Sequence, residues 1–160
     1  MMPYPYARWA PLVLRLITGI GLMAHGMAKL LRGPEAFAAV LDGMHVPLAG
    51  PMAWLTILVE LGGGLATLLG AYIPLVTIPV AIVLIVAMAK VHWPYGFSSI
   101  KLVSYTALGP VFGPPGYELD LFYLACLTAL TVGGPGPLAL DHLFAGWRTW
   151  RESRVREHNN

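Results

Sequence analysis

Three basic residues interrupt an apolar segment near the start of the chain. The segment LRLITGIGLMAHGMAKL covers residues 14–30 and contains Arg15, His25 and Lys29. Because a helix turns by about 100° per residue, these three side chains share one of its sides. An ionisable group within a membrane helix is costly unless it is paired or hydrated. The stripe therefore predicts polar chemistry inside a helical bundle, such as hydrogen bonding to a ligand or proton transfer.

A second apolar segment supplies a carboxylate that matches this stripe. Glu60, within TILVELGGGLAT, is the only acid deep in any predicted membrane span. His25 lies roughly 9 Å and Glu60 roughly 12 Å from the outer ends of two antiparallel helices, so their depths agree. The glycines at 62–64 let a neighbouring helix approach closely and, with Gly26, leave room for a ligand. We predict a catalytic group of Glu60, His25 and Lys29.

Residues at the outer ends of two further helices are predicted to add ligand-binding groups. His92 follows the third apolar segment, and Glu118 begins the fourth on the same side. Arg15 lies in another layer near the inner end, where its best candidate partner is Asp141. We predict a structural ion pair between Arg15 and Asp141, because buried pairs commonly fix helix register. A ligand-binding role for Arg15 stays open.

The sequence also limits the cofactors that the chain can hold. Histidines and carboxylates are residue types that bind transition metals, but the sequence has no closely spaced pair such as HxxxH. We therefore predict no metal site. The single cysteine, Cys126, excludes a disulfide or a CxxC pair within the chain. Haem-type ligand pairs and flavin or NAD signatures are also missing. Electron transfer would therefore use a bound cofactor such as a quinone, or the thiols of a partner.

Composition indicates the scaffold that positions these groups. The chain has 160 residues, of which 57% are hydrophobic and 11% charged, whereas soluble domains carry about 25% charged residues. Since a membrane span takes roughly 20 mostly apolar residues, the sequence predicts an all-α fold, a four-helix transmembrane bundle in one domain over residues 8–141. The predicted spans are residues 10–31, 52–71, 74–91 and 118–132, with longer loops at 32–51 and 92–117.

Basic residues predict the orientation of this bundle. Arg8 and the four arginines of the tail FAGWRTWRESRVR outnumber the cations at the other end. The positive-inside rule then places both termini in the cytoplasm, for a multi-pass protein of the cell (inner) membrane. The tail, residues 142–160, interleaves aromatic side chains with arginines and is predicted to be an amphipathic, basic segment on anionic lipid. A solvated tail that only sets topology is the alternative.

The order of these motifs resembles the DoxX family of small four-helix membrane proteins. The motifs are GLMAHGMAKL at 21–30, VELGGG at 59–64, GYELD at 116–120 and GGPGPLALD at 133–141, and the resemblance runs over residues 12–141. It implies a helical membrane bundle and a subunit of a thiosulfate:quinone oxidoreductase, or of a complex that links thiol and sulfur metabolism to oxidative-stress defence. One departure is Ala139, where the family usually has a serine.

Two functions remain open at this stage. In the first, the chain is the membrane subunit of a quinone-linked oxidoreductase system, in which His25 or Lys29 donates hydrogen bonds to quinone carbonyls and Glu60 relays a proton. In the second, it is a non-enzymatic scaffold for soluble partners or a carrier of a small anion such as thiosulfate. Expected partners are the lipid bilayer, a quinone or small anion, and a soluble oxidoreductase. A homo-oligomer is compatible with the sequence, and nothing points to nucleic acid.

Overall fold

Helices make up most of the described chain. The computed structural model describes residues 6–142, so the predicted basic tail lies outside the described residues except for His142. The elements are a 3-10 turn Ala7–Trp9, α1 (Ala10–Arg32), α2 (Pro34–Gly43), α3 (Ala49–Leu69), α4 (Ile73–Ala87), a π-helical turn Met88–His92, a 3-10 turn Trp93–Tyr95, β1 (Leu102–Thr106), β2 (Gly109–Phe112) and α5 (Glu118–Gly133).

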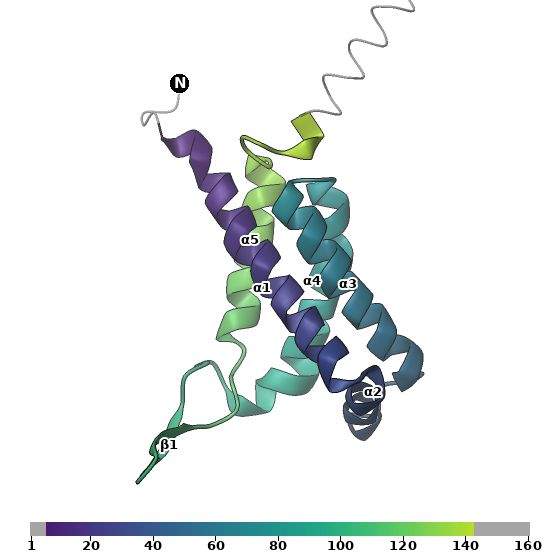
Figure 1. Cartoon of the computed structure of the whole chain (residues 1–160), viewed down its shortest axis with the longest axis vertical. Helices are drawn as coiled ribbons and strands as arrows, with labels where there is room; N and C mark the ends of the chain where they lie inside the picture. Colours follow the sequence, from purple (N-terminus) through teal and green to yellow (C-terminus); the bar gives the residue numbers. More distant parts are fainter. Residues whose placement is uncertain (1–5, 143–160) are drawn as a thin grey trace, which may run out of the picture.

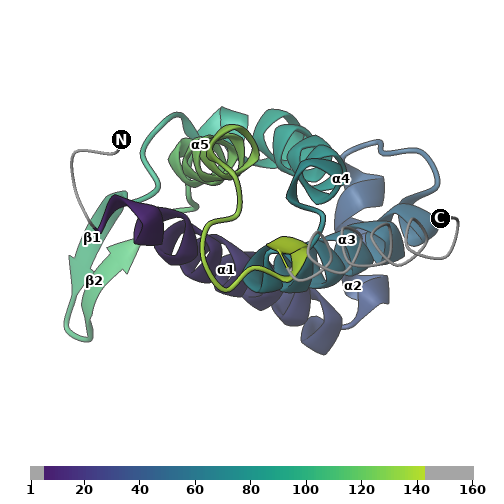
Figure 2. The same cartoon turned by 90° about the horizontal axis from the view of Figure 1, so that it is seen from above.

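The long helices α1, α3, α4 and α5 pack against one another in a closed order. α1 lies mainly against α3, α3 against α4, α4 against α5, and α5 returns to α1 (Figures 1 and 2). The short helix α2 packs on α3 at one end of the bundle (Figure 1). A core of five buried side chains joins α1, α4 and α5: Leu22, Val80, Leu84, Tyr123 and Leu127.

Three helical stretches of the described chain are long and apolar enough to cross a membrane. They are Ala7–Arg32, Ala49–Leu69 and Ile73–Tyr95. Helix α5 has 16 residues, which corresponds to about 24 Å at 1.5 Å per residue and is short for a span. The fourth predicted span therefore stays a prediction, although α5 packs as the fourth long helix of the bundle.

Both predicted outer loops contain regular structure. Residues 34–43 form α2, which begins with Pro34 at its first position and carries Glu35 in its first turn, both favourable at a helix N-terminus. In the other loop, β1 and β2 form an antiparallel hairpin with a β-bulge between Leu102 and Ser104. The fold is therefore mainly helical with one small sheet, and the prediction of an all-α fold is corrected to that extent.

Glycines allow α1 and α3 to meet almost backbone to backbone. A Cβ atom at Gly64 would lie 2.9 Å from the carbonyl oxygen of Gly19 and 2.8 Å from Cγ of Met23. A Cβ atom at Gly26 would lie 3.1 Å from Cβ of Glu60. The predicted close packing next to Glu60 is confirmed. The predicted room for a ligand is not, because these positions, and Gly63 against Val80, are occupied by neighbouring helices.

This contact gives a prediction with an internal control. Gly64→Ala should lower the thermal stability in detergent, because overpacking a tight interface typically costs about 1–3 kcal/mol. Gly62→Ala in the same helix has nothing within 4 Å of its new Cβ atom and should leave stability unchanged or raise it slightly. Equal melting temperatures for the two variants would show that α1 and α3 do not pack as described.

Candidate functional site

An ion pair between α1 and α3 lies at the centre of the candidate site. Nζ of Lys29 is 2.6 Å from both Oε1 and Oε2 of Glu60. Glu60 is only 6% exposed, and the lysine side chain is partly exposed. The ammonium group also lies 5.3 Å from the ring centre of Phe37 on α2. Lys29 thus neutralises a buried carboxylate at one end and contacts an aromatic ring beside it.

His25 lies one helical turn before Lys29, on the same side of α1. Its ring meets that of Tyr123 on α5 edge to face, with centroids 6.0 Å apart. No hydrogen-bond partner for the imidazole occurs within residues 6–142, and His25 lines the cavity described below. Its ring therefore lies in the cavity wall without a hydrogen bond to the described residues.

A second side-chain pair joins the π-helical turn after α4 to the first turn of α5. Nδ1 of His92 lies 2.6 Å from Oδ2 of Asp120, and Asp120 is buried. His92 ends the π-helical turn Met88–His92, an irregularity that is frequent at functional sites. The partner of His92 is therefore Asp120, a residue that the sequence places beside Glu118 but that we did not predict for the site.

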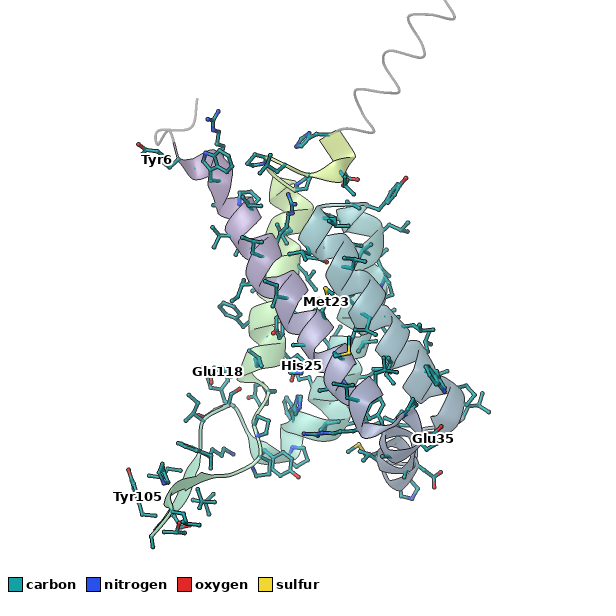
Figure 3. All side chains as sticks on the ribbon, in the orientation of Figure 1. Tyr6, Met23, His25, Glu35, Tyr105 and Glu118 are labelled. Atoms are coloured by element: carbon teal, nitrogen blue, oxygen red, sulfur yellow. The ribbon has the colours of Figure 1, made fainter. Side chains whose placement is uncertain are left out.

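Glu118 does not join this group. Its Oε2 accepts a hydrogen bond from the backbone N–H of Ser99 at 3.0 Å, and Figure 3 shows it where the hairpin segment meets α5. Residues two apart on a helix point to nearly opposite sides, at about 200°, so Asp120 and Glu118 cannot both face the bundle. In the structure Glu118 supports the hairpin base and does not line the cavity described below, so its ligand-binding role stays a prediction.

Arg15 has no donor left for a ligand. Its side chain is 2% exposed, and its five N–H groups match five hydrogen bonds to backbone carbonyl oxygens. Nε and Nη2 donate to Leu68, Nη2 also to Leu138, and Nη1 to Pro135 and Pro137, over 2.9–3.3 Å. The guanidinium thus caps the C-terminus of α3, where a cation is favoured, and fixes the loop after α5.

The predicted ion pair between Arg15 and Asp141 is not formed. Within residues 6–142 the acidic side chains in direct contact with a basic side chain are Glu60, with Lys29, and Asp120, with the imidazole of His92. Asp141 instead accepts the backbone N–H of Tyr72 at 2.8 Å, and its own N–H donates to the carbonyl of Gly70 at 3.1 Å. Both residues organise the same turn: their hydrogen bonds go to backbone groups, and the two charges attract each other without direct contact.

A cavity of about 270 Å³ opens next to these pairs, between α1, α2, α3 and α4. Its lining is mainly apolar, and its polar groups are His25, Lys29, Thr56, Lys90 and His92. The apolar part is formed by Phe37, Leu41, Met44, Val46, Met52, Leu55, Ile82, Val83, Val86, Ala87 and Val91. A ligand with an apolar body and hydrogen-bond acceptors at one end would match this lining.

A second cavity of about 290 Å³ adjoins the first between α1 and α2. Both cavities share His25, Lys29 and Phe37, and the second adds Arg32. The polar stripe of α1 therefore has two parts. Arg15 and Thr18 are buried within the bundle, whereas His25 and Lys29 line cavities.

Comparison with known protein families gives a match over the first half of the chain. A family model described as DoxX matches residues 10–93, from the first residue of α1 to the 3-10 turn after α4. The match includes His25, Lys29, Glu60 and His92, and it ends before α5. Comparisons with curated proteins and with solved structures find no similar chain.

Proposed function

The chain belongs to the DoxX family, and on that premise we propose that it is the membrane subunit of a quinone-linked oxidoreductase system. The system would act in thiol or thiosulfate metabolism or in oxidative-stress defence. The observation that supports this proposal is the apolar cavity lined by His25, Lys29 and His92, next to the buried carboxylate of Glu60. Two of these groups, Lys29 and Glu60, are already in contact.

The residues around the cavity suit a quinone in kind. Aliphatic and methionine side chains contact an apolar ring, and the polar end offers N–H donors for its carbonyl oxygens. The volume of about 270 Å³ is near the lower end of the range of about 300–1,000 Å³ for ligand pockets. It therefore fits a ring headgroup, with an isoprenoid tail extending into the lipid.

Each charged residue has a proposed task. Lys29 and His25 donate hydrogen bonds to a bound carbonyl, while Glu60 holds or transfers a proton through Lys29. His92, oriented by Asp120, provides a second proton-transfer group at the outer end of the cavity. A bound quinone takes up two electrons and two protons to become a quinol. The electrons come from a sulfur compound or thiol that a soluble oxidoreductase partner oxidises.

The proposal includes a membrane orientation. In it, helix α5 serves as a short fourth span and both termini lie in the cytoplasm, in a protein of the cell (inner) membrane. The arginine excess near both ends of the chain supports this orientation. The cavity then lies in the outer half of the bilayer, because α2 and the ends of α1 and α4 that form it are at the opposite end of the bundle from the start of α1 and the end of α5 (Figure 1).

One observation favours a different function. The cavity between α1 and α2 has three basic lining residues, His25, Lys29 and Arg32, a composition that suits a small anion. The alternative proposal is therefore a carrier of a small anion, or a scaffold for soluble partners, without redox chemistry in the bundle.

Mass spectrometry of the gently extracted protein distinguishes the two proposals. The quinone-linked proposal predicts close to one quinone per chain after extraction and washing. A soluble partner that copurifies reproducibly without any quinone would contradict it and support the scaffold. Saturable anion binding without a quinone would support the carrier.

A further inference from the structure

The β1–β2 hairpin exposes apolar side chains that no other part of the described chain covers. All five residues of β1 are exposed, and because successive strand residues point to opposite faces, both faces of the hairpin are uncovered there. Leu108 at the tip is 101% exposed. Other exposed apolar residues of the hairpin segment are Ile100, Leu102, Val103, Tyr105, Val111 and Phe112.

The hairpin segment is also nearly free of charge. Between Trp93 and Tyr117 the sequence contains a single ionisable group other than tyrosine, Lys101. A protein-binding surface normally carries a polar rim around its apolar centre, and one partner surface would cover only one face of the ribbon. Exposed apolar groups on both faces, without charges around them, favour a lipid environment.

The position of the hairpin relative to the helices is fixed at its base. Oγ of Ser99 donates to the carbonyl of Gly116 and accepts from the N–H of Leu119, and the N–H of Glu118 donates to the carbonyl of Phe97. A Cβ atom at Gly116 would lie within 2.6 Å of three carbonyl oxygens. These contacts hold the segment against the first turn of α5.

From this base the hairpin extends obliquely, to the side of the bundle and past the start of α5 (Figure 1). Figure 1 shows it at the same end as α2, and Figure 2 shows it beside the helices rather than across their ends. The third membrane-capable stretch ends at Tyr95, directly before the segment. The rings of Trp93 and Tyr117 stack with centroids 5.1 Å apart at its base, and Trp and Tyr are enriched at membrane surfaces.

We propose that this hairpin lies in the boundary between lipid headgroups and acyl chains of the leaflet at the α2 end, where it acts as a lateral anchor of the bundle. Open strand edges exclude it from the hydrocarbon centre, because their backbone groups need polar partners. Its apolar side chains disfavour water. The boundary offers polar headgroups to the strand edges and to Lys101, and acyl chains to the apolar side chains. This inference does not depend on whether the cavity binds a quinone.

Spin labels on single cysteines test the proposal on the full-length protein in lipid nanodiscs. Cys126 is buried and is the only cysteine, so Cys126→Ala provides the background for Val103→Cys and Leu108→Cys, each made separately. Leu58→Cys on the exposed side of α3 is the lipid control, and Asp42→Cys at the end of α2 is the water control. Relaxation by oxygen and by a water-soluble nickel chelate is compared for each label.

At least one hairpin label is expected to respond like the label at position 58, with several-fold more effect from oxygen than from the nickel chelate. A response like that at position 42 from both hairpin labels would overturn the proposal, because the hairpin would then lie in water. Spin–spin broadening that disappears on dilution with unlabelled protein would also overturn it, since it would show that a second copy covers the hairpin.

Discussion

The Glu60→Gln variant is expected to insert and fold but to lose most quinone reduction in membranes. The glutamine keeps the shape of the side chain and still accepts a hydrogen bond from Lys29, which lies 2.6 Å from the carboxylate. It can no longer take up and release a proton. Since general acid–base groups contribute about 10²- to 10⁴-fold, the rate of quinol formation with thiosulfate or a thiol as donor should fall by a factor in this range.

A double variant that lacks both charges of the Lys29–Glu60 pair separates an effect on proton transfer from an effect on folding. Removing one member of a buried pair typically costs about 3–5 kcal/mol, whereas removing both can be nearly neutral. The variant Glu60→Gln with Lys29→Met should therefore recover melting temperature relative to the single variant without recovering activity. Full activity in either variant that folds would show that the Lys29–Glu60 pair is only a structural contact between α1 and α3.

The Arg15→Lys variant is expected to be strongly destabilised. A lysine keeps the charge but has three donors in place of five and no planar fork. At least two of the five hydrogen bonds to carbonyl oxygens would be lost in a buried position. Each unsatisfied buried group costs about 1–3 kcal/mol, so thermal unfolding in detergent should show a loss on the order of 3–5 kcal/mol.

Asp141→Asn is the matched comparison. The amide oxygen of asparagine can still accept the N–H of Tyr72, which lies 2.8 Å from Oδ1 of Asp141. This variant should therefore unfold within a few degrees of the wild type, whereas Arg15→Lys should not. Comparable losses in the two variants would instead favour the ion pair that the sequence predicted.

The ion pair between Lys29 and Glu60 could be predicted because helical periodicity and the depth of each residue along its helix were sufficient. Helical periodicity places Lys29 and His25 on one side of α1, and counting residues from the helix ends gives Glu60 a similar depth on the antiparallel helix α3. A mid-span carboxylate needs a cation, and Lys29 is the partner observed. These arguments need no knowledge of loops.

The partners of Arg15 could not be predicted from residue types. Its acceptors are backbone carbonyls at the end of α3 and in the turn around Pro137, and every residue has such a carbonyl. Residue types suggest a carboxylate as the partner of an arginine. Asp141 is close to the same turn, but its carboxylate accepts a backbone N–H. A turn rich in glycine and proline was the available signal that backbone groups would be exposed there.

The partner of His92 could not be predicted because it depends on the structure of the segment before α5. Glu118 and Asp120 both begin α5, and only the hydrogen bonds of the hairpin base to α5 determine which of them faces His92. The family match ends at residue 93, before this segment, and the motif GYELD at 116–120 contains both acids. The hairpin itself was missed because its two strands are short and lie among glycines and prolines.

The most direct test of the proposed quinone site is to fill the cavity with a larger side chain and to measure the affinity for a quinone. Ala87 lines the cavity, and Ala87→Phe should fill much of it, while Leu58→Phe on the exposed side of α3 adds a ring that faces away from it. Binding of a short-chain quinone to each protein in nanodiscs would be measured by titration. The account predicts saturable binding to wild type and Leu58→Phe, and at least tenfold weaker binding to Ala87→Phe. Equal affinity in all three proteins, or no saturable binding to the wild type, would contradict it.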